Sequence, residues 1–406
     1  MAVTPSSNSE PLICKEETMR YRPLGKTGLK ISALAMGCMR LSEDQDVNTR
    51  IVSMAVDLGV NYFETTRWYC GGQCQHRTAP GLTGKTQGVI VSGKCGIGPD
   101  STAYSFYKEI ELQLQILGLT HFKFYQVGWF SWAMMPHLIK RGGVLDAIRR
   151  AKDEGLIHHV GFTGHDRPEN FTKCIETGLF DCITIPYNLV NRSYEPTINR
   201  AGELGVGVIA MCSVAGGVLA CDSPKLREAL HVDMPSAAMA LRFVLSNPNI
   251  SAACSGMHTM EMLEQNVRTA KEFDPATKGA FQQMCEGLDR LREVLGSKFC
   301  TGCSYCQPCP QGVNIPRHME LHRYWQAFAL VDGVREALNA MPESWKASHC
   351  NECGKCEKAC PNGLPIREML KEVSQLATGR APRSPRSPRG RKTARPSARG
   401  SVRGGR

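Results

Sequence analysis

Short apolar segments alternate with segments of helical period between residues 31 and 270, and this alternation restricts the fold more than any other feature of the sequence. The expected strands are 31–38, 61–65, 88–92, 122–127, 159–162, 182–186, 207–211 and 250–254. The expected helices are 47–58, 104–117, 144–153, 169–177, 194–204, 237–245 and 259–270. Eight strands that alternate with helices over about 230 residues are typical of a parallel (β/α)8 barrel. We therefore predict an α/β fold, a TIM barrel.

The barrel leaves room for other segments at both ends of the 406-residue chain. Residues 1–18 show no periodicity and predict a loose leader, and a hairpin at 21–31 opens the barrel unit of 19–274. An amphipathic run over 275–299 predicts a connecting helix. Residues 300–377 predict a small helical module, and the Arg-, Pro-, Ser- and Gly-rich residues 378–406 predict a disordered tail.

The net charge of +11 comes almost entirely from that tail. Residues 380–406 hold nine arginines and one lysine with no acidic residue, so the remainder is nearly neutral. A nearly neutral body argues against a nucleic-acid-binding surface, and the tail has no aromatic side chains for base stacking. The sequence has no apolar run near the ~20 residues that span a bilayer, and residues 1–20 lack a signal-peptide core. We predict a cytoplasmic protein with no membrane insertion.

Nineteen cysteines in that compartment indicate metal thiolates and free thiols rather than disulfides. Eight of them form two runs, which are Cys300, Cys303, Cys306 and Cys309, then Cys350, Cys353, Cys356 and Cys360. The second run, followed by Pro361, has the ferredoxin spacing that holds an iron–sulfur cluster, and the first is one residue shorter before its last cysteine. We predict [4Fe–4S] binding, against zinc or structural thiols as alternatives.

The number of clusters depends on how the two runs share their ligands. In two-cluster ferredoxins the fourth cysteine of each run binds the other cluster. We therefore predict two clusters with exchanged fourth ligands, in which Cys360 completes the first set and Cys309 the second. A single cluster on the second run is the alternative.

Catalytic residues of such barrels lie at the carboxyl ends of the strands. Reading those ends gives 37–39, 64–69, Lys94, 128–129, 163–165, 187–188, 212–217 and 255–258. Free cysteines near the same ends, such as Cys70, Cys74 and Cys212, are more often small apolar fillers than ligands.

Five stretches resemble the aldo/keto reductase family, in particular its members with a C-terminal ferredoxin-type module. They are 21–29, 59–66, 125–129, 210–219 and 240–266. The likeness spans roughly residues 19–377. It implies hydride transfer between a nicotinamide cofactor, NAD(P)(H), and a small-molecule carbonyl substrate.

The resemblance also implies catalytic roles. Tyr69 matches the family's proton donor and Lys94 its lysine, while Glu64 stands in place of the expected aspartate. Gly128 stands where a histidine is expected, and His165 is the nearest candidate to fill that gap. A free tyrosine has a pKa near 10, and an ammonium within ~4–6 Å is expected to lower it.

For the cofactor, the resemblance and the strand ends indicate a set of binding residues. They are Gly37, Met39, Thr163, Gly216, Gly217, Ser255, Gly256, Met257 and Asn266. The helix start after Gly256 suits a phosphate. The family has a basic residue at the position of Gly256 to bind a 2′-phosphate, and Arg268 lies nearby in the sequence. Thr184 replaces an expected glutamine. The sequence therefore does not decide between NAD and NADP as the cofactor.

Three functions follow in order of preference. The first is an iron–sulfur oxidoreductase that exchanges electrons with a ferredoxin or another redox partner. The second is a catalytically degenerate barrel that acts as an electron carrier or binding subunit. The third is nucleic-acid association through the basic tail.

Overall fold

The computed structural model describes residues 18–221, 223–273, 279–295, 300, 305–360 and 363–378. The expected leader up to residue 17, Cys303 and the tail from residue 379 lie outside the described residues. So do residue 274, at the end of the expected barrel unit, and residues 275–278 and 296–299 of the expected connecting segment.

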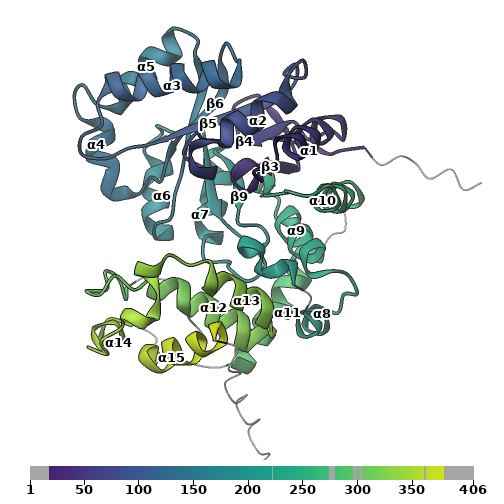
Figure 1. Ribbon diagram of the computed structural model, residues 1–406, viewed down its shortest axis with the longest axis vertical. Coiled ribbons are helices and arrows are strands. Elements are labelled where there is room, and N and C mark those ends of the chain that lie inside the picture. The colour runs from purple at the N-terminus through teal and green to yellow at the C-terminus, as the bar shows by residue number, and fades with distance from the viewer. Residues whose placement is uncertain are drawn as a thin grey trace, which may run out of the picture.

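Eight parallel strands form a closed barrel in the order β10-β3-β4-β5-β6-β7-β8-β9 (Figure 1). The strands are β3 (Leu34–Gly37), β4 (Tyr62–Glu64), β5 (Ile90–Gly96), β6 (Phe122–Gly128), β7 (Ile157–Thr163), β8 (Cys182–Pro186), β9 (Gly207–Met211) and β10 (Ala252–Ser255). The predicted (β/α)8 barrel is therefore confirmed. Because all strands run the same way, their carboxyl ends meet at one mouth.

A hairpin of β1 (Tyr21–Pro23) and β2 (Lys30–Ser32) closes the opposite end of the barrel. Leu24 and Ile31 from this hairpin pack with the inward-facing residues of the strands in one buried cluster. The turn at Gly25 lies against Gly207 at the start of β9, where an added Cβ would be only 2.4 Å from the Gly207 nitrogen. The hairpin thus leaves the carboxyl ends of the strands as the open mouth.

Ten helices accompany the barrel strands in the described residues. They are α1 (Gln45–Asp57), α2 (Cys74–Leu82), α3 (Ala103–Leu117), α4 (Met135–Ile139), α5 (Val144–Asp153), α6 (Pro168–Glu176), α7 (Glu195–Leu204), α8 (Pro224–Leu230), α9 (Ser236–Ser246) and α10 (Met260–Glu272). Helices α2, α4 and α8 were not predicted. Two of them are short, and α2 carries Gly81 and an internal Pro80, which hide its periodicity.

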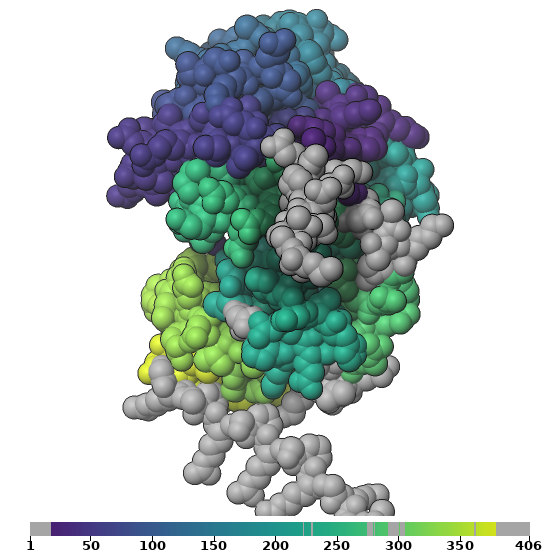
Figure 2. All heavy atoms as spheres, turned by 90° about the vertical axis from the view of Figure 1, so that its right-hand side faces the viewer, coloured from purple at the N-terminus to yellow at the C-terminus, as the bar shows by residue number. Residues whose placement is uncertain are grey.

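The C-terminal module consists of helices and loops. Its helices are α12 (Ile315–Phe328), α13 (Val331–Asn339), α14 (Lys355–Lys358) and α15 (Ile366–Ala377), and α11 (Ala280–Leu295) precedes them. Figure 2 shows the purple and blue barrel residues and the yellow-green module at opposite ends of the molecule, with teal and green residues between them. No helix among the described residues is long and apolar enough to cross a membrane.

The module is fixed to the barrel by buried contacts and not by the connecting segment alone. Ser223 Oγ donates a hydrogen bond of 2.5 Å to the carbonyl of Phe328, the last residue of α12. Gly333 on α13 packs against Val218 and Cys221, where a Cβ would approach within 3.0 Å. Leu321 and other α12 residues share one hydrophobic core with the barrel helices. The module therefore sits against the segments that follow β9.

Candidate active site and cysteine module

A buried lysine occupies the centre of the barrel mouth. Lys94 Nζ donates to Glu64 Oε1 at 2.7 Å and to the Tyr69 hydroxyl oxygen at 3.1 Å. The lysine side chain is only 1 % exposed and the glutamate 6 %. The structure thus brings together all three residues expected to be catalytic.

Strand register explains why Glu64 and Lys94 meet. Glu64 is the last residue of β4 and lies opposite Ser92 of β5. Lys94 is two residues beyond Ser92, so it points to the same inner face of the barrel. At the sixth barrel strand, Thr184 Oγ1 donates to the other oxygen of Glu64 at 3.4 Å. Thr184, which stands where a glutamine is expected, therefore supports the glutamate.

The loop after β4 delivers Tyr69 to this pair. Three successive residues after it, Cys70, Gly71 and Gly72, have positive φ angles of 55°, 63° and 91°. This tight turn lets the Tyr69 carbonyl accept hydrogen bonds from the backbone N–H groups of Gly72 and Cys74. A non-glycine residue with positive φ costs strain that surrounding structure must hold, and such residues cluster at functional sites.

The charges in the barrel mouth determine the protonation of the tyrosine. Burial raises the pKa of Tyr69 above its ordinary value of 10; the Lys94 charge lowers it, and Glu64 acts against Lys94. Lys94 thus acts in the expected direction, but burial first and Glu64 second outweigh it, so the pKa of Tyr69 is raised and not lowered. Burial works against the charge of Lys94 itself, but Glu64 and Tyr69 outweigh it and raise the pKa of Lys94. The site holds a protonated phenol beside a charged ammonium.

The residue at the position of the expected histidine is a glycine, so it offers no side chain to a substrate. Gly128 ends β6, and the next residue, Trp129, adopts a left-handed conformation with φ of 51°. Its indole packs edge-on against the Tyr69 ring with 6.1 Å between centroids and is 48 % exposed. His165 opens onto the same mouth and senses the Lys94 charge, but among the described residues it donates no hydrogen bond to Tyr69 or Lys94. The protein around it lowers the pKa of His165 by burial.

The residues expected to hold a cofactor fall into two groups. Gly216, Gly217 and Gly256 are exposed at the mouth, after β9 and β10 respectively, and Met39 is exposed after β3. Gly37 lies half-buried at the end of β3. These positions offer accessible backbone to a ligand.

The second group is buried. Asn266 Nδ2 donates to Ser255 Oγ at 3.2 Å, which fastens helix α10 to the end of β10. Thr163 Oγ1 lies 3.7 Å from the sulfur of Met211 and is shielded in β7. The side chain of Met257 is 1 % exposed and belongs to the hydrophobic core, so only its backbone is left for the expected cofactor contact.

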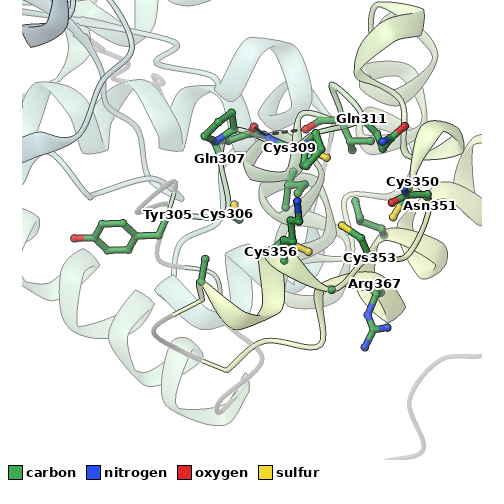
Figure 3. A pocket seen from close by; sticks show the side chains of 18 residues that line it. Tyr305, Cys306, Gln307, Cys309, Gln311, Cys350, Asn351, Cys353, Cys356 and Arg367 are labelled. Atoms are coloured by element: carbon green, nitrogen blue, oxygen red, sulfur yellow. Dashed lines mark hydrogen bonds between the residues drawn. The ribbon is translucent and has the colours of Figure 1, made fainter.

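The module's thiols surround a cavity of about 230 Å³. Five cysteines of both runs line it, and Figure 3 shows them around one space: Cys306, Cys309, Cys350, Cys353 and Cys356. The backbone N–H of Cys309 donates to Gln307 Oε1 at 2.8 Å, which fixes the turn that presents it. Soft thiolate ligands converging from two runs fit the chemistry of an iron–sulfur cluster.

Two family models match adjacent parts of the chain. The aldo/keto reductase family model matches residues 33–286, well over half of the chain. The chain belongs to the aldo/keto reductase family. A 4Fe–4S dicluster domain model matches residues 299–365, so this aldo/keto reductase also carries an iron–sulfur cluster domain.

Relatives and solved structures agree with this assignment. An L-galactose dehydrogenase of Arabidopsis thaliana is 26% identical in an alignment of 290 residues that covers 63% of this chain and 89% of the relative. An uncharacterized oxidoreductase of Bacillus subtilis is 22% identical over 285 residues, 62% of this chain and 91% of the relative. An aldo-keto reductase from Bacillus halodurans has the same fold, with a TM-score of 0.59 and 23% identity over 66% of this chain and 96% of its own. This aldo/keto reductase is therefore an oxidoreductase.

The module also contributes charged residues to the mouth of the reductase barrel. Arg317 on α12 lies 3.9 Å from where a Cβ on Gly216 would be, and it pairs with Glu320 one turn along the helix. The charges of both residues reach His165 and Cys212. No sequence pattern marked these two residues, because they reach the barrel only when the module folds back onto it.

Proposed function

We propose that this aldo/keto reductase interconverts a small carbonyl compound and its alcohol with a nicotinamide dinucleotide. The observation that carries the proposal is the buried chain of contacts from Glu64 through Lys94 to Tyr69. A buried ion pair that ends on a tyrosine hydroxyl at the mouth of such a barrel fits proton transfer in catalysis. The cofactor supplies or accepts the hydride.

Each of the three residues has a defined part in the proton step. Since the Lys94 N–H donates to the Tyr69 oxygen, the tyrosine's own hydroxyl hydrogen is left to donate to a substrate carbonyl oxygen. Its raised pKa keeps that hydrogen in place at neutral pH. As the substrate oxygen takes the proton, the adjacent ammonium stabilises the developing phenolate. Glu64 keeps Lys94 charged inside the barrel.

The backbone at the mouth supplies a binding site for the dinucleotide. Gly216 and Gly217 are exposed after β9 and have φ angles of 69° and 102°, a left-handed backbone that L side chains rarely adopt. Gly256 precedes helix α10, whose first turn is capped by Thr259 Oγ1 accepting from the N–H of Met262 at 3.2 Å. Glycines that admit a close backbone approach, next to a helix N-terminus, suit a phosphate-bearing ligand. NAD and NADP both meet these requirements.

The cysteine module adds a single-electron route. We propose two [4Fe–4S] clusters with exchanged fourth ligands, one held by Cys300, Cys303, Cys306 and Cys360, and the other by Cys350, Cys353, Cys356 and Cys309. The position of Cys309 in one cavity with Cys350, Cys353 and Cys356 supports the second set. A ferredoxin or a similar carrier would then exchange electrons with the module.

The test compares Tyr69→Phe with wild-type protein purified without oxygen. Loss of the hydroxyl should reduce kcat/KM for carbonyl reduction by about 10²–10⁴-fold, while the Kd for NADH or NADPH stays the same. The matched control is Tyr104→Phe on α3, whose ring is 71% exposed and takes no part in the Glu64–Lys94–Tyr69 contacts. If wild-type protein binds neither nucleotide and reduces no compound in a panel of aldehydes and ketones, the proposal is wrong.

The gap at Gly128 favours one competing function. Without the histidine, the substrate oxygen lacks a second hydrogen-bond donor, whose removal elsewhere costs about 10²–10³ in rate. A barrel that binds a ligand without reacting, and a module that only carries electrons, would fit this gap. Stoichiometric hydride transfer from NADH or NADPH to any aldehyde, ketone or quinone would exclude it.

A further inference from the structure

An arginine that no motif marked crosses the mouth between the two glycine loops. Arg40 follows β3 in the short helix of Cys38–Arg40. Its guanidinium Nη2 donates to the carbonyl of Gly216 at 3.2 Å, after β9. Its aliphatic stem lies over Gly256, after β10. One side chain thus joins the loops of three strands at the place expected for the cofactor.

The glycine at 256 is what makes room for this side chain. A Cβ built on Gly256 would lie 2.9 Å from Arg40 Cγ and 3.3 Å from Arg40 Cβ, and its next neighbour is the Gly37 carbonyl at 3.7 Å. Gly256 does not have a positive φ, so its backbone itself would accept alanine. The absent side chain therefore leaves room for the stem of Arg40, whose guanidinium lies at Gly216.

The charge on Arg40 is uncompensated. Within the part of the chain that the structure describes, no carboxylate pairs with it, and its one hydrogen bond goes to a neutral carbonyl. The other guanidinium near Gly216, from Arg317, is paired with Glu320. Arg40 is exposed, and its charge reaches Cys212 inside the mouth. A guanidinium that has no carboxylate partner and lies beside an exposed glycine turn is suited to bind two oxygens of an anionic group, in preference to a neutral ligand.

We propose that Arg40 binds the pyrophosphate of the nicotinamide dinucleotide, which displaces the Gly216 carbonyl from the guanidinium. This inference rests on the proposed function, because it assumes that a dinucleotide occupies the mouth. The pyrophosphate is favoured over the 2′-phosphate because the guanidinium lies at Gly216 and only the stem lies at Gly256. The pyrophosphate is common to NADH and NADPH.

The experiment titrates NADH and NADPH, followed by their fluorescence, into anaerobically purified full-length protein. Arg40→Ala should weaken both nucleotides equally, by about 10- to 100-fold in Kd, because a charge-assisted hydrogen bond is lost. The Kd values of Arg40→Lys should lie between those of the wild type and Arg40→Ala, since lysine keeps the positive charge but loses the planar guanidinium that donates two parallel hydrogen bonds. The matched control is Arg149→Ala on α5, an arginine 65 % exposed and far from the mouth. Its Kd values should equal those of the wild type.

A second variant tests the geometry without removing the charge. Gly256→Ala adds one methyl group that collides with Arg40 alone and should weaken both nucleotides by displacing it. In Arg40→Ala the closest neighbour, Cγ at 2.9 Å, is gone, and the methyl meets only the Cβ of residue 40 at 3.3 Å and the Gly37 carbonyl at 3.7 Å. The double variant should therefore bind no more weakly than Arg40→Ala. Additive losses in the double variant would show that Gly256 acts on the ligand directly and would contradict the proposal.

The outcomes separate this inference from the proposed function. If wild-type protein binds nucleotide and Arg40→Ala changes Kd less than twofold, the arginine assignment is wrong and the proposed function stands. Weakening of NADPH alone would place Arg40 on the 2′-phosphate and overturn the pyrophosphate assignment. If wild-type protein binds neither nucleotide, both proposals fail together. Unchanged iron content and unfolding temperature in each variant would exclude a folding defect as the cause.

Discussion

Removing the carboxylate beneath Lys94 should destabilise the barrel strongly and in a pH-dependent way. In Glu64→Gln, an ammonium that is 1 % exposed loses the one ion-pair partner that it has among the described residues. At 2.7 Å and an effective dielectric constant of 20, the lost attraction is about 6 kcal/mol. The glutamate's own desolvation offsets part of it, and deleting one member of a buried pair costs about 3–5 kcal/mol in practice. We expect that loss in the free energy of unfolding at pH 7.

The pH dependence of this loss has a definite sign. In the wild type the pKa of Lys94 is raised above its ordinary 10.5, so its stabilising contribution is complete below that pH and disappears only above it. In Glu64→Gln the contribution of Glu64 is lost, and burial, which is the largest influence on Lys94, lowers its pKa. The variant therefore regains stability as the pH rises toward the pKa of the free lysine side chain. The difference between the two proteins should therefore shrink above about pH 9.

Anaerobic urea denaturation followed by tryptophan fluorescence measures the difference, with cluster absorbance recorded separately to follow the module. The matched control is Asp57→Asn, which breaks the exposed Lys85–Asp57 pair at 2.5 Å and should cost less than about 1 kcal/mol. Adding Lys94→Met to Glu64→Gln should recover most of the loss, because no buried charge remains. A loss below about 1 kcal/mol in Glu64→Gln alone would refute a desolvated ion pair at this site.

Three further predictions concern thiols and the histidine gap. The hydrogen bond from Cys74, aided by Arg77, lowers the pKa of Cys70 to about 6, whereas desolvation by the surrounding protein raises the pKa of Cys212 to about 11. Iodoacetamide should therefore alkylate Cys70 before Cys212 at pH 7, as mass spectrometry can show, although Cys212 is the more exposed residue. Cys309→Ala should reduce iron from about eight to about four atoms per chain and leave the first-run cluster's electron paramagnetic resonance signal. Gly128→His should raise kcat for carbonyl reduction by at least about tenfold, because a Cβ there meets its nearest atom at 3.4 Å and the ring adds a second donor to the substrate oxygen.

Each has an outcome that contradicts it. Faster labelling of Cys212 than of Cys70 would show that exposure outweighs the thiol pKa. Unchanged iron in Cys309→Ala would leave that cysteine outside the second cluster. A Gly128→His protein that folds, binds nucleotide and gains no rate would show that the missing histidine is not what limits the reaction.

The fold was predictable because its determinants are local. Apolar runs bounded by turns identified all eight barrel strands, and the bounds of β8, β9 and α5 agree with the structure. Helix α2 was missed because its packing against α1 and α3, and not its own residue pattern, keeps Pro80 and Gly81 in a helix. Tertiary contacts outweigh propensity in such short elements.

The sequence by itself determined the barrel, the spacing of the cysteine runs and the alignment of Glu64, Tyr69 and Lys94 at strand ends, because periodicity and spacing are properties of neighbouring residues. Only the tertiary structure decided the charge state of Tyr69, since burial and the Glu64–Lys94 pair act through space. It alone brought Arg40 to Gly216 across 176 residues, and Arg317 to the same turn from the module. Electrostatic fields and long-range contacts depend on distances in the folded chain, which no local pattern encodes.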